Sequence, residues 1–123
     1  MAKEIHSSDW AAFCQRISRQ RAGAMVKLEV AGPDGFKTER AANATLQSMT
    51  FDKTDACSDV ITLRLRDTHE IIHEIIEPIQ IGLHSSGTAD DFNLLHIKAE
   101  SGVTFMTFHP TIHPQMLEGL KTS

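Results

Sequence analysis

The fold is decided by the stretch from Val60 to Phe108, where short apolar–polar alternations are separated by turn residues: VITLRLR (60–66), IQIGL (79–83), FNLLHIKA (92–99) and VTFMTF (103–108). Side chains on a β-strand change face at every residue, so this period of two predicts a sheet with one face against a core. No catalytic signature interrupts the runs. Short strands joined by short connections usually pair with their sequence neighbours, so the sheet is expected to be antiparallel.

One long helix is predicted over residues 9–21. The polar residues Ser7, Ser8 and Asp9 can cap its first turn. Apolar side chains then recur at the spacing of one helix face, at Trp10, Phe13, Cys14 and Ile17. Gly23 can adopt the left-handed conformation that ends a helix.

The other elements are shorter. A strand is predicted over residues 24–30, before a turn at 32–35. The polar, alanine-rich run 36–45 predicts a weak edge strand, 46–51 a separate short strand, and 114–120 a helical turn. The expected fold is α+β, an N-terminal helix packed on a curved antiparallel β-meander or a small, partly closed β-barrel, in a single domain over residues 1–123.

Length and charge exclude several classes of protein. A chain of 123 residues can bury one ordinary core. The net charge of −4 argues against a protein that binds a nucleic-acid backbone. No run approaches the ~20 apolar residues of a membrane span, and no secretory signal is visible, so a cytoplasmic location is expected. No nucleic-acid partner, membrane partner or cofactor is expected.

Seven histidines in a small chain suggest a metal site. Histidines four residues apart on a strand lie about 13 Å apart, too far to share one ion. Histidines on neighbouring strands can converge, and His84, His96 and His109 are the candidate set. The alternative is a scatter of separate histidines, because no Cys/His spacing of the zinc type accompanies them.

Cys14 is the other candidate for chemistry. It could act as a nucleophile only if a base and positive surroundings lowered the pKa of its thiol. It lies within the apolar stripe of the helix, where free cysteine usually acts as a small hydrophobic residue. An enzyme built on Cys14 or on a His/Asp pair is therefore the least favoured of the three functional hypotheses.

The run from Ile71 to Ile76 is apolar on both faces if it forms a strand. One face can lie on the core, and the other needs the helix, the barrel interior or a second copy of the chain. Exposed apolar patches generally mark interfaces, and symmetric dimers are the commonest oligomers. The sequence therefore predicts a homodimer with Ile72 and Ile76 at the interface.

Landmarks along the chain resemble those of a group of short bacterial proteins. The earlier landmarks are Asp9-Trp10, Phe13, Ser18-Arg19-Gln20 and Leu28-Glu29-Val30 before Gly32-Pro33-Asp34-Gly35. The later ones are Leu46, Met49, Asp52, Asp59, Ile61, His73, Ile75, Pro78, Pro114 and Met116. That group is catalogued only as a domain of unknown function. The resemblance implies a compact single domain and transfers no functional residues to this chain.

The preferred hypothesis is therefore a cytoplasmic, non-enzymatic domain that acts through protein binding or self-association. The alternative is a small-ligand or metal-binding β-barrel with histidines at the mouth of its pocket.

Overall fold

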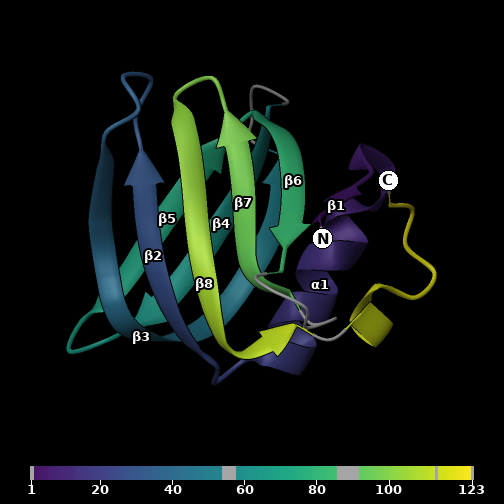
Figure 1. The fold of residues 1–123 in the computed structure, drawn as a ribbon, viewed down its shortest axis with the longest axis horizontal. Coiled ribbons are helices and arrows are strands. Elements are labelled where there is room, and N and C mark those ends of the chain that lie inside the picture. Colours follow the sequence, from purple (N-terminus) through teal and green to yellow (C-terminus); the bar gives the residue numbers. More distant parts are fainter. Residues whose placement is uncertain (1, 54–57, 86–91, 113, 123) are drawn as a thin grey trace.

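A computed structural model describes residues 2–53, 58–85, 92–112 and 114–122 of the chain. In these residues one helix is followed by most of a large antiparallel sheet (Figure 1). The elements are β1 (Ala2–Ile5), α1 (Trp10–Arg21), β2 (Met25–Ala31), β3 (Lys37–Lys53), β4 (Asp59–Arg66), β5 (Glu70–Ile76), β6 (Pro78–His84), β7 (Phe92–Ala99) and β8 (Gly102–Ile112), with 3-10 turns at Ser7–Asp9 and Pro114–Leu117.

The eight strands form one sheet in the order β1-β6-β7-β8-β2-β3-β4-β5. From β2 to β8, consecutive strands pair with each other, except for β5 and β6. β8 pairs with β2 on its other side. Figure 1 shows β2, β8, β7 and β6 in one layer, with β3 curving round and β4 and β5 crossing behind. The described strands form a strongly curved sheet that is not closed. This confirms the α+β class with a helix on a curled antiparallel sheet.

The helix α1 covers part of the curved sheet, mainly along β3. Its buried residues are Trp10, Phe13, Cys14 and Ile17, the stripe predicted from the sequence. The Trp10 indole donates a hydrogen bond of 3.0 Å to the Ile5 carbonyl, and its ring meets Phe51 edge-on with 6.2 Å between centroids. These contacts tie α1 to both β1 and β3. The buried side chains of helix and sheet form one continuous core.

The prediction for residues 36–51 is wrong in two respects. One strand, β3, runs through Lys37–Lys53, and it lies between β2 and β4 instead of at an edge. Its register shifts between Leu46 and Ser48 on the β4 side, and twice more where its first half pairs with β2, each time with the extra residue on β3. Each bulge breaks the period of two, so one long strand looks like two short ones.

The other predicted elements agree with the structure to within a few residues, apart from β1, which the sequence analysis missed, and β8, which continues to Ile112. The predicted final helical turn is a 3-10 turn. The sequence also predicts loops over residues 52–59 and 85–91. Asp52 and Lys53 instead end β3 and Asp59 begins β4, while residues 54–57 and 86–91 lie outside the described residues. Within the described part of the chain, no helix is both long and apolar enough to cross a membrane.

Candidate functional site

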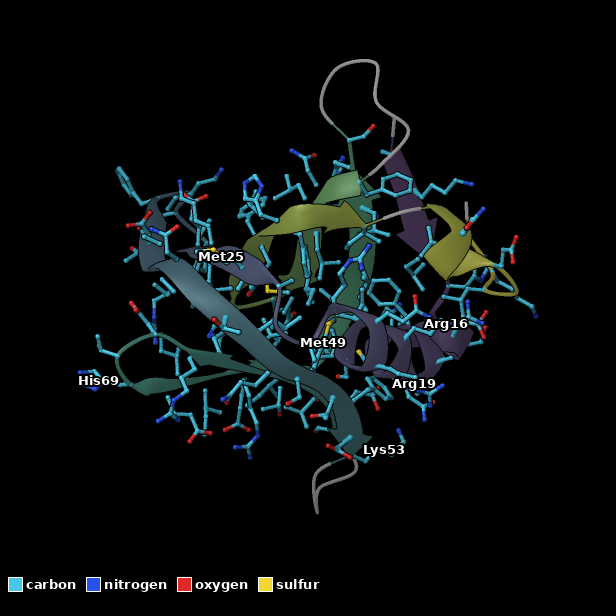
Figure 2. All side chains as sticks on the ribbon, turned by 90° about the horizontal axis from the view of Figure 1, so that it is seen from below. Arg16, Arg19, Met25, Met49, Lys53 and His69 are labelled. Carbon is cyan, nitrogen blue, oxygen red and sulfur yellow. The ribbon has the colours of Figure 1, made fainter. Side chains whose placement is uncertain are left out.

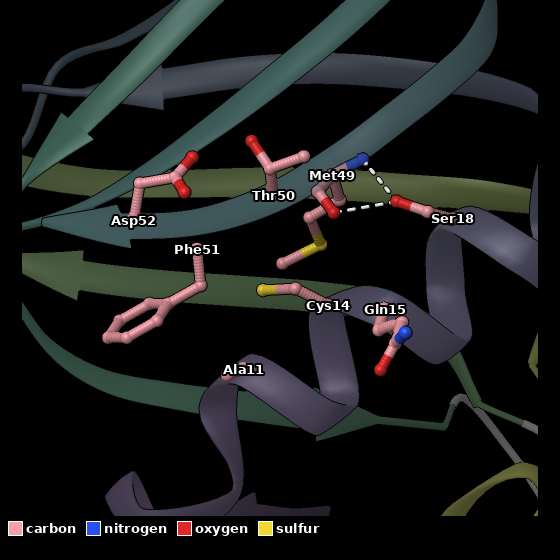
Figure 3. A pocket seen from close by; sticks show the side chains of 8 residues that line it. All are labelled: Ala11, Cys14, Gln15, Ser18, Met49, Thr50, Phe51 and Asp52. Atoms are coloured by element: carbon pink, nitrogen blue, oxygen red, sulfur yellow. Dashed lines mark hydrogen bonds between the residues drawn. The ribbon is translucent and has the colours of Figure 1, made fainter.

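A surface hollow of about 300 Å³ lies where α1 meets the second half of β3 (Figure 3). At the rim of this hollow, the Ser18 hydroxyl forms two hydrogen bonds with the main chain of Met49. The Ser18 hydroxyl donates to the Met49 carbonyl at 2.6 Å, and the Met49 N–H donates to the Ser18 oxygen at 2.7 Å. Figure 2 shows Met49 on the side of the sheet that faces the helix. This serine attaches the helix to β3 at a point where, among the described strands, only β4 pairs with β3.

Cys14 lines the same hollow, but its thiol is not suited to catalysis. Burial, and to a smaller extent the nearby Asp52 carboxylate, raises the pKa of Cys14 to about 12. At neutral pH the sulfur is therefore protonated and a poor nucleophile. Cys14 is buried in the core, as the sequence predicts. The second cysteine, Cys57, lies outside the described residues.

Two of the three histidines proposed as metal ligands come together on the outer face of the sheet. His84 Nε2 on β6 and His96 Nδ1 on β7 are 2.7 Å apart, and the ring centroids are 4.7 Å apart. His109 does not join them, because it lies exposed on β8 opposite Met25 of β2. The predicted set is thus reduced to a pair. Figure 2 places His69, which the sequence spaces four residues from His73, at the tip of the β4–β5 turn.

Gly82 makes room for the pair. A Cβ atom at Gly82 would lie 2.3 Å from His96 Cε1, so the imidazole occupies the space that a side chain would need. Glu4 on β1 and His96 on β7 are each directly opposite Gly82, and the three residues form one row across the sheet. Directly paired residues share a face, so Glu4 projects on the same side as the two imidazoles. A hollow of about 270 Å³ lies among these residues.

His96 sits in surroundings that disfavour its charged form. Burial lowers the pKa of His96, and the positive charges of His84 and Lys98 lower it further, while Glu4 acts in the opposite direction. The neutral form of His96 is therefore favoured, in which one ring nitrogen donates a hydrogen bond and the other accepts one. Among the described residues, no three His, Cys, Asp or Glu side chains are already arranged to hold a metal ion.

His73 lies on the inner face of β5, half-buried, and contacts β8. Its Nε2 is 3.0 Å from the hydroxyl oxygen of Thr104, which is itself buried. Burial lowers the pKa of His73, and Arg40 adds to this shift. A cavity of only about 40 Å³ adjoins the contact, so it is a bridge inside the curved sheet with little room for a ligand.

The outer face of β5 exposes both interface candidates. Ile72 is 49% exposed and Ile76 is 58% exposed, whereas Ile75 on the other face is buried. Neither the helix nor another strand of the described chain covers Ile72 and Ile76. Ile79, at the start of β6, is exposed as well, so three of the large exposed hydrophobic residues lie within eight positions of the chain.

β5 also presents unpaired main-chain groups. Glu77 N–H donates to the Asp59 carbonyl at 2.8 Å, which continues the β4–β5 ladder by one residue. Hydrogen-bonded positions alternate in an antiparallel ladder. The N–H and C=O groups of Ile72, Glu74 and Ile76 therefore point away from β4, towards the free edge. No main-chain bond joins that edge to another described segment.

The opposite edge of the sheet is treated differently. β1 is bridged by the C-terminal segment, through a pairing of Ile5 with Thr122 and a 2.9 Å bond from the His6 N–H to the Lys121 carbonyl. Edge strands that are left open are the usual sites of strand pairing between chains. Of the two edges, only β5 combines unpaired main chain with exposed isoleucines in the described structure.

Sequence reasoning missed three residues around the imidazole pair: Glu4, Gln80 and Gly82. Their position depends on β1, a strand of four residues, three of them exposed, whose alternation is too short to recognise. The isolated glycine in the run 79–83 was the available signal, because a glycine inside a strand often marks close approach by another group.

Comparisons with known proteins place the chain in a family without assigning it an activity. A search of the curated proteins and a search of the solved structures each found no match. The model of the family of unknown function DUF5335 matches residues 1–114. The chain therefore belongs to the DUF5335 family, a family of unknown function.

Proposed function

We propose that this chain is a non-enzymatic, cytoplasmic domain that acts through self-association, and that β5 is the contact strand. The observation that carries the proposal is the free edge of β5, whose outer face exposes Ile72 and Ile76. Main-chain hydrogen bonds across such an edge supply affinity, and alternate side chains supply specificity.

A second copy of the chain fits this edge. Two β5 strands can pair antiparallel about a two-fold axis perpendicular to the sheet, which places the outer faces of both copies on the same side. If the axis passes midway between the two copies of Glu74, Ile72 of one copy lies opposite Ile76 of the other. The outward main-chain groups of Ile72, Glu74 and Ile76 then all find partners. Cross-strand apolar pairs each contribute roughly 0.2–1 kcal/mol beyond the main-chain bonds.

This register also brings Glu74 opposite its own copy. Like charges directly opposite are destabilising, by an amount comparable to that of a favourable pair. Glu74→Gln removes this repulsion and should strengthen the dimer, by roughly two- to five-fold in Kd for a change of 0.4–1 kcal/mol. In a register that placed Glu74 opposite an isoleucine, Glu74→Gln would not strengthen the dimer in this way.

The test is sedimentation equilibrium over a range of protein concentrations. The unmodified chain should be dimeric at high concentration, and Ile72→Lys should be monomeric. Met25→Lys is the matched control, because Met25 is 48% exposed but lies on β2, away from the free edge. A chain that stays monomeric up to millimolar concentration, or lysine variants that dissociate alike, would contradict the proposal.

The main chain can be tested separately. The N–H of Glu74 points outward, so Glu74→Pro removes a donor from the free edge while the ladder to β4 keeps its bonds. Proline is tolerated on edge strands where the N–H faces solvent. This variant should stay folded by circular dichroism and lose self-association. A folded Glu74→Pro variant that dimerises normally would exclude pairing through β5.

A further inference from the structure

The imidazole pair has a geometry that a bound cation would complete. His84 Nε2 and His96 Nδ1 face each other at 2.7 Å, close enough that a proton must lie between them. Two nitrogens on one tetrahedral zinc ion, at Zn–N distances of 2.0–2.1 Å, are separated by about 3.3 Å. Opening the pair by roughly 0.6 Å would therefore allow an ion to replace the shared proton.

A carboxylate lies on the same face, one strand beyond the glycine. Glu4 is in register with Gly82, and the His96 ring extends over Gly82. The Glu4 carboxylate accepts a hydrogen bond from the Gln80 amide, which holds it beside the hollow. A carboxylate oriented by a neighbouring amide is a common arrangement around protein-bound metals.

We propose that His84, His96 and Glu4 bind a divalent first-row transition-metal ion of the zinc type, with water in the remaining position. Imidazole nitrogen and carboxylate oxygen are ligands that zinc accepts at tetrahedral sites. Binding needs no net loss of a proton from two neutral imidazoles. The ring that carries the shared N–H takes its other neutral tautomer, and each nitrogen facing the hollow then offers a lone pair.

Gly82 has a specific role in this site. A methyl group at residue 82 would overlap the His96 ring, with contacts of 2.3 Å to Cε1 and 2.7 Å to Nε2. The atoms that it would meet belong to the ring at the end of the His96 side chain and not to the main chain, so Gly82→Ala should fold normally and yet separate the two imidazoles. The site thus requires a residue without a side chain at position 82, in addition to the side chains of His84, His96 and Glu4.

The experiment uses the full chain without a polyhistidine tag. Zn²⁺ binding is measured by titration calorimetry, and Co²⁺ binding by its visible absorption, which reports coordination number. One ion should bind per chain. His84→Ala, His96→Ala and Gly82→Ala should each weaken binding by about ten-fold or more, and Glu4→Gln by about ten-fold. His109→Ala is the matched control and should bind as the unmodified chain does.

Two further measurements separate loss of the site from loss of the fold. Melting temperatures without metal establish that each variant is folded. In the unmodified chain, the imidazole nitrogen resonances of His84 and His96 should shift on addition of Zn²⁺, while those of His69 and His109 should not. The proposal is overturned if no saturable binding occurs, if His84→Ala and His109→Ala bind equally, or if other histidines shift instead. None of these outcomes bears on association through β5.

Discussion

Replacing Ser18 by alanine tests how the helix is attached to the sheet. β2 pairs with β3 only as far as Thr45, and Leu46 bonds the main chain of Gly23 and Ala24. At Met49, β3 has β4 on one side and α1 on the other. Ser18 takes the place of a strand there, because one hydroxyl both donates to and accepts from the main chain of Met49. Alanine leaves both Met49 groups without that partner.

The cost follows from these two bonds. Each is short, and each contributes about 0.5–1.5 kcal/mol net, so Ser18→Ala should lower the free energy of unfolding by about 1–3 kcal/mol. For a chain of this size, 1 kcal/mol corresponds to roughly 3–5 °C in Tm. A loss of 2 kcal/mol would therefore lower Tm by about 8 °C. The hollow beside Ser18 admits water, which favours the lower half of the range.

Urea unfolding followed by circular dichroism measures the difference, with Ser48→Ala as the control. Ser48 is half-buried on β3, one residue from Met49, and its hydroxyl bonds no other described residue. Its replacement should change stability by less than about 0.5 kcal/mol. If the two variants are destabilised equally, the Ser18 bonds do not hold α1 on the sheet. A larger m-value for Ser18→Ala would instead indicate a changed unfolded state.

Three further predictions concern single residues. Burial lowers the pKa of His73 in the folded state, so the unfolded chain binds the proton first and the free energy of unfolding should fall as pH drops below about 6.5. His73→Gln should reduce that fall, measured by urea unfolding at pH 7.5 and 5.5. An added Cβ at Gly102, where φ is +144°, would lie 2.1 Å from a main-chain oxygen, whereas one at Gly35, where φ is +85°, would meet no atom within 4 Å. Gly102→Ala should therefore lower the free energy of unfolding by at least about 1 kcal/mol more than Gly35→Ala, as measured by thermal melts. In a Cys57→Ser background, Cys14 should resist an aromatic disulfide reagent at pH 8 until urea unfolds the chain; rapid labelling of the folded protein would contradict its raised pKa.

The strands that could be predicted are those whose period of two is unbroken. Residues 92–99 alternate regularly and form β7 with the predicted bounds. β3 could not be predicted from a period of two, because its buried residues are spaced by three, two and three positions: Ala41, Ala44, Leu46 and Met49. Bulges cause that spacing, and a bulge is specified by the pairing of two strands, so one strand's sequence does not reveal it.

The candidate sites show the same limit. Histidines on neighbouring strands could be proposed to converge, but their register could not be known. His84 and His96 meet because Gly82 is opposite His96, which brings the two rings onto adjacent rows of one face. His109 is also a strand residue, but it lies on another part of the sheet. The contact of His73 with Thr104 joins strands that are not neighbours in the sheet, so no pattern local to the sequence encodes it.

The open edge itself follows from one connection. Every other pair of consecutive strands from β2 to β8 is paired, but β5 and β6 are joined by Glu77 alone, which has φ +52°. A hairpin needs about two residues in its loop, and Pro78 cannot donate a main-chain bond. β6 therefore leaves the direction of β5 and pairs with β7, while β2 and β8 close the far side. A fully closed sheet has no edges to protect. In this chain the gap falls beside Ile72 and Ile76, so the connection that prevents closure within one copy also exposes the apolar residues that a second copy can cover.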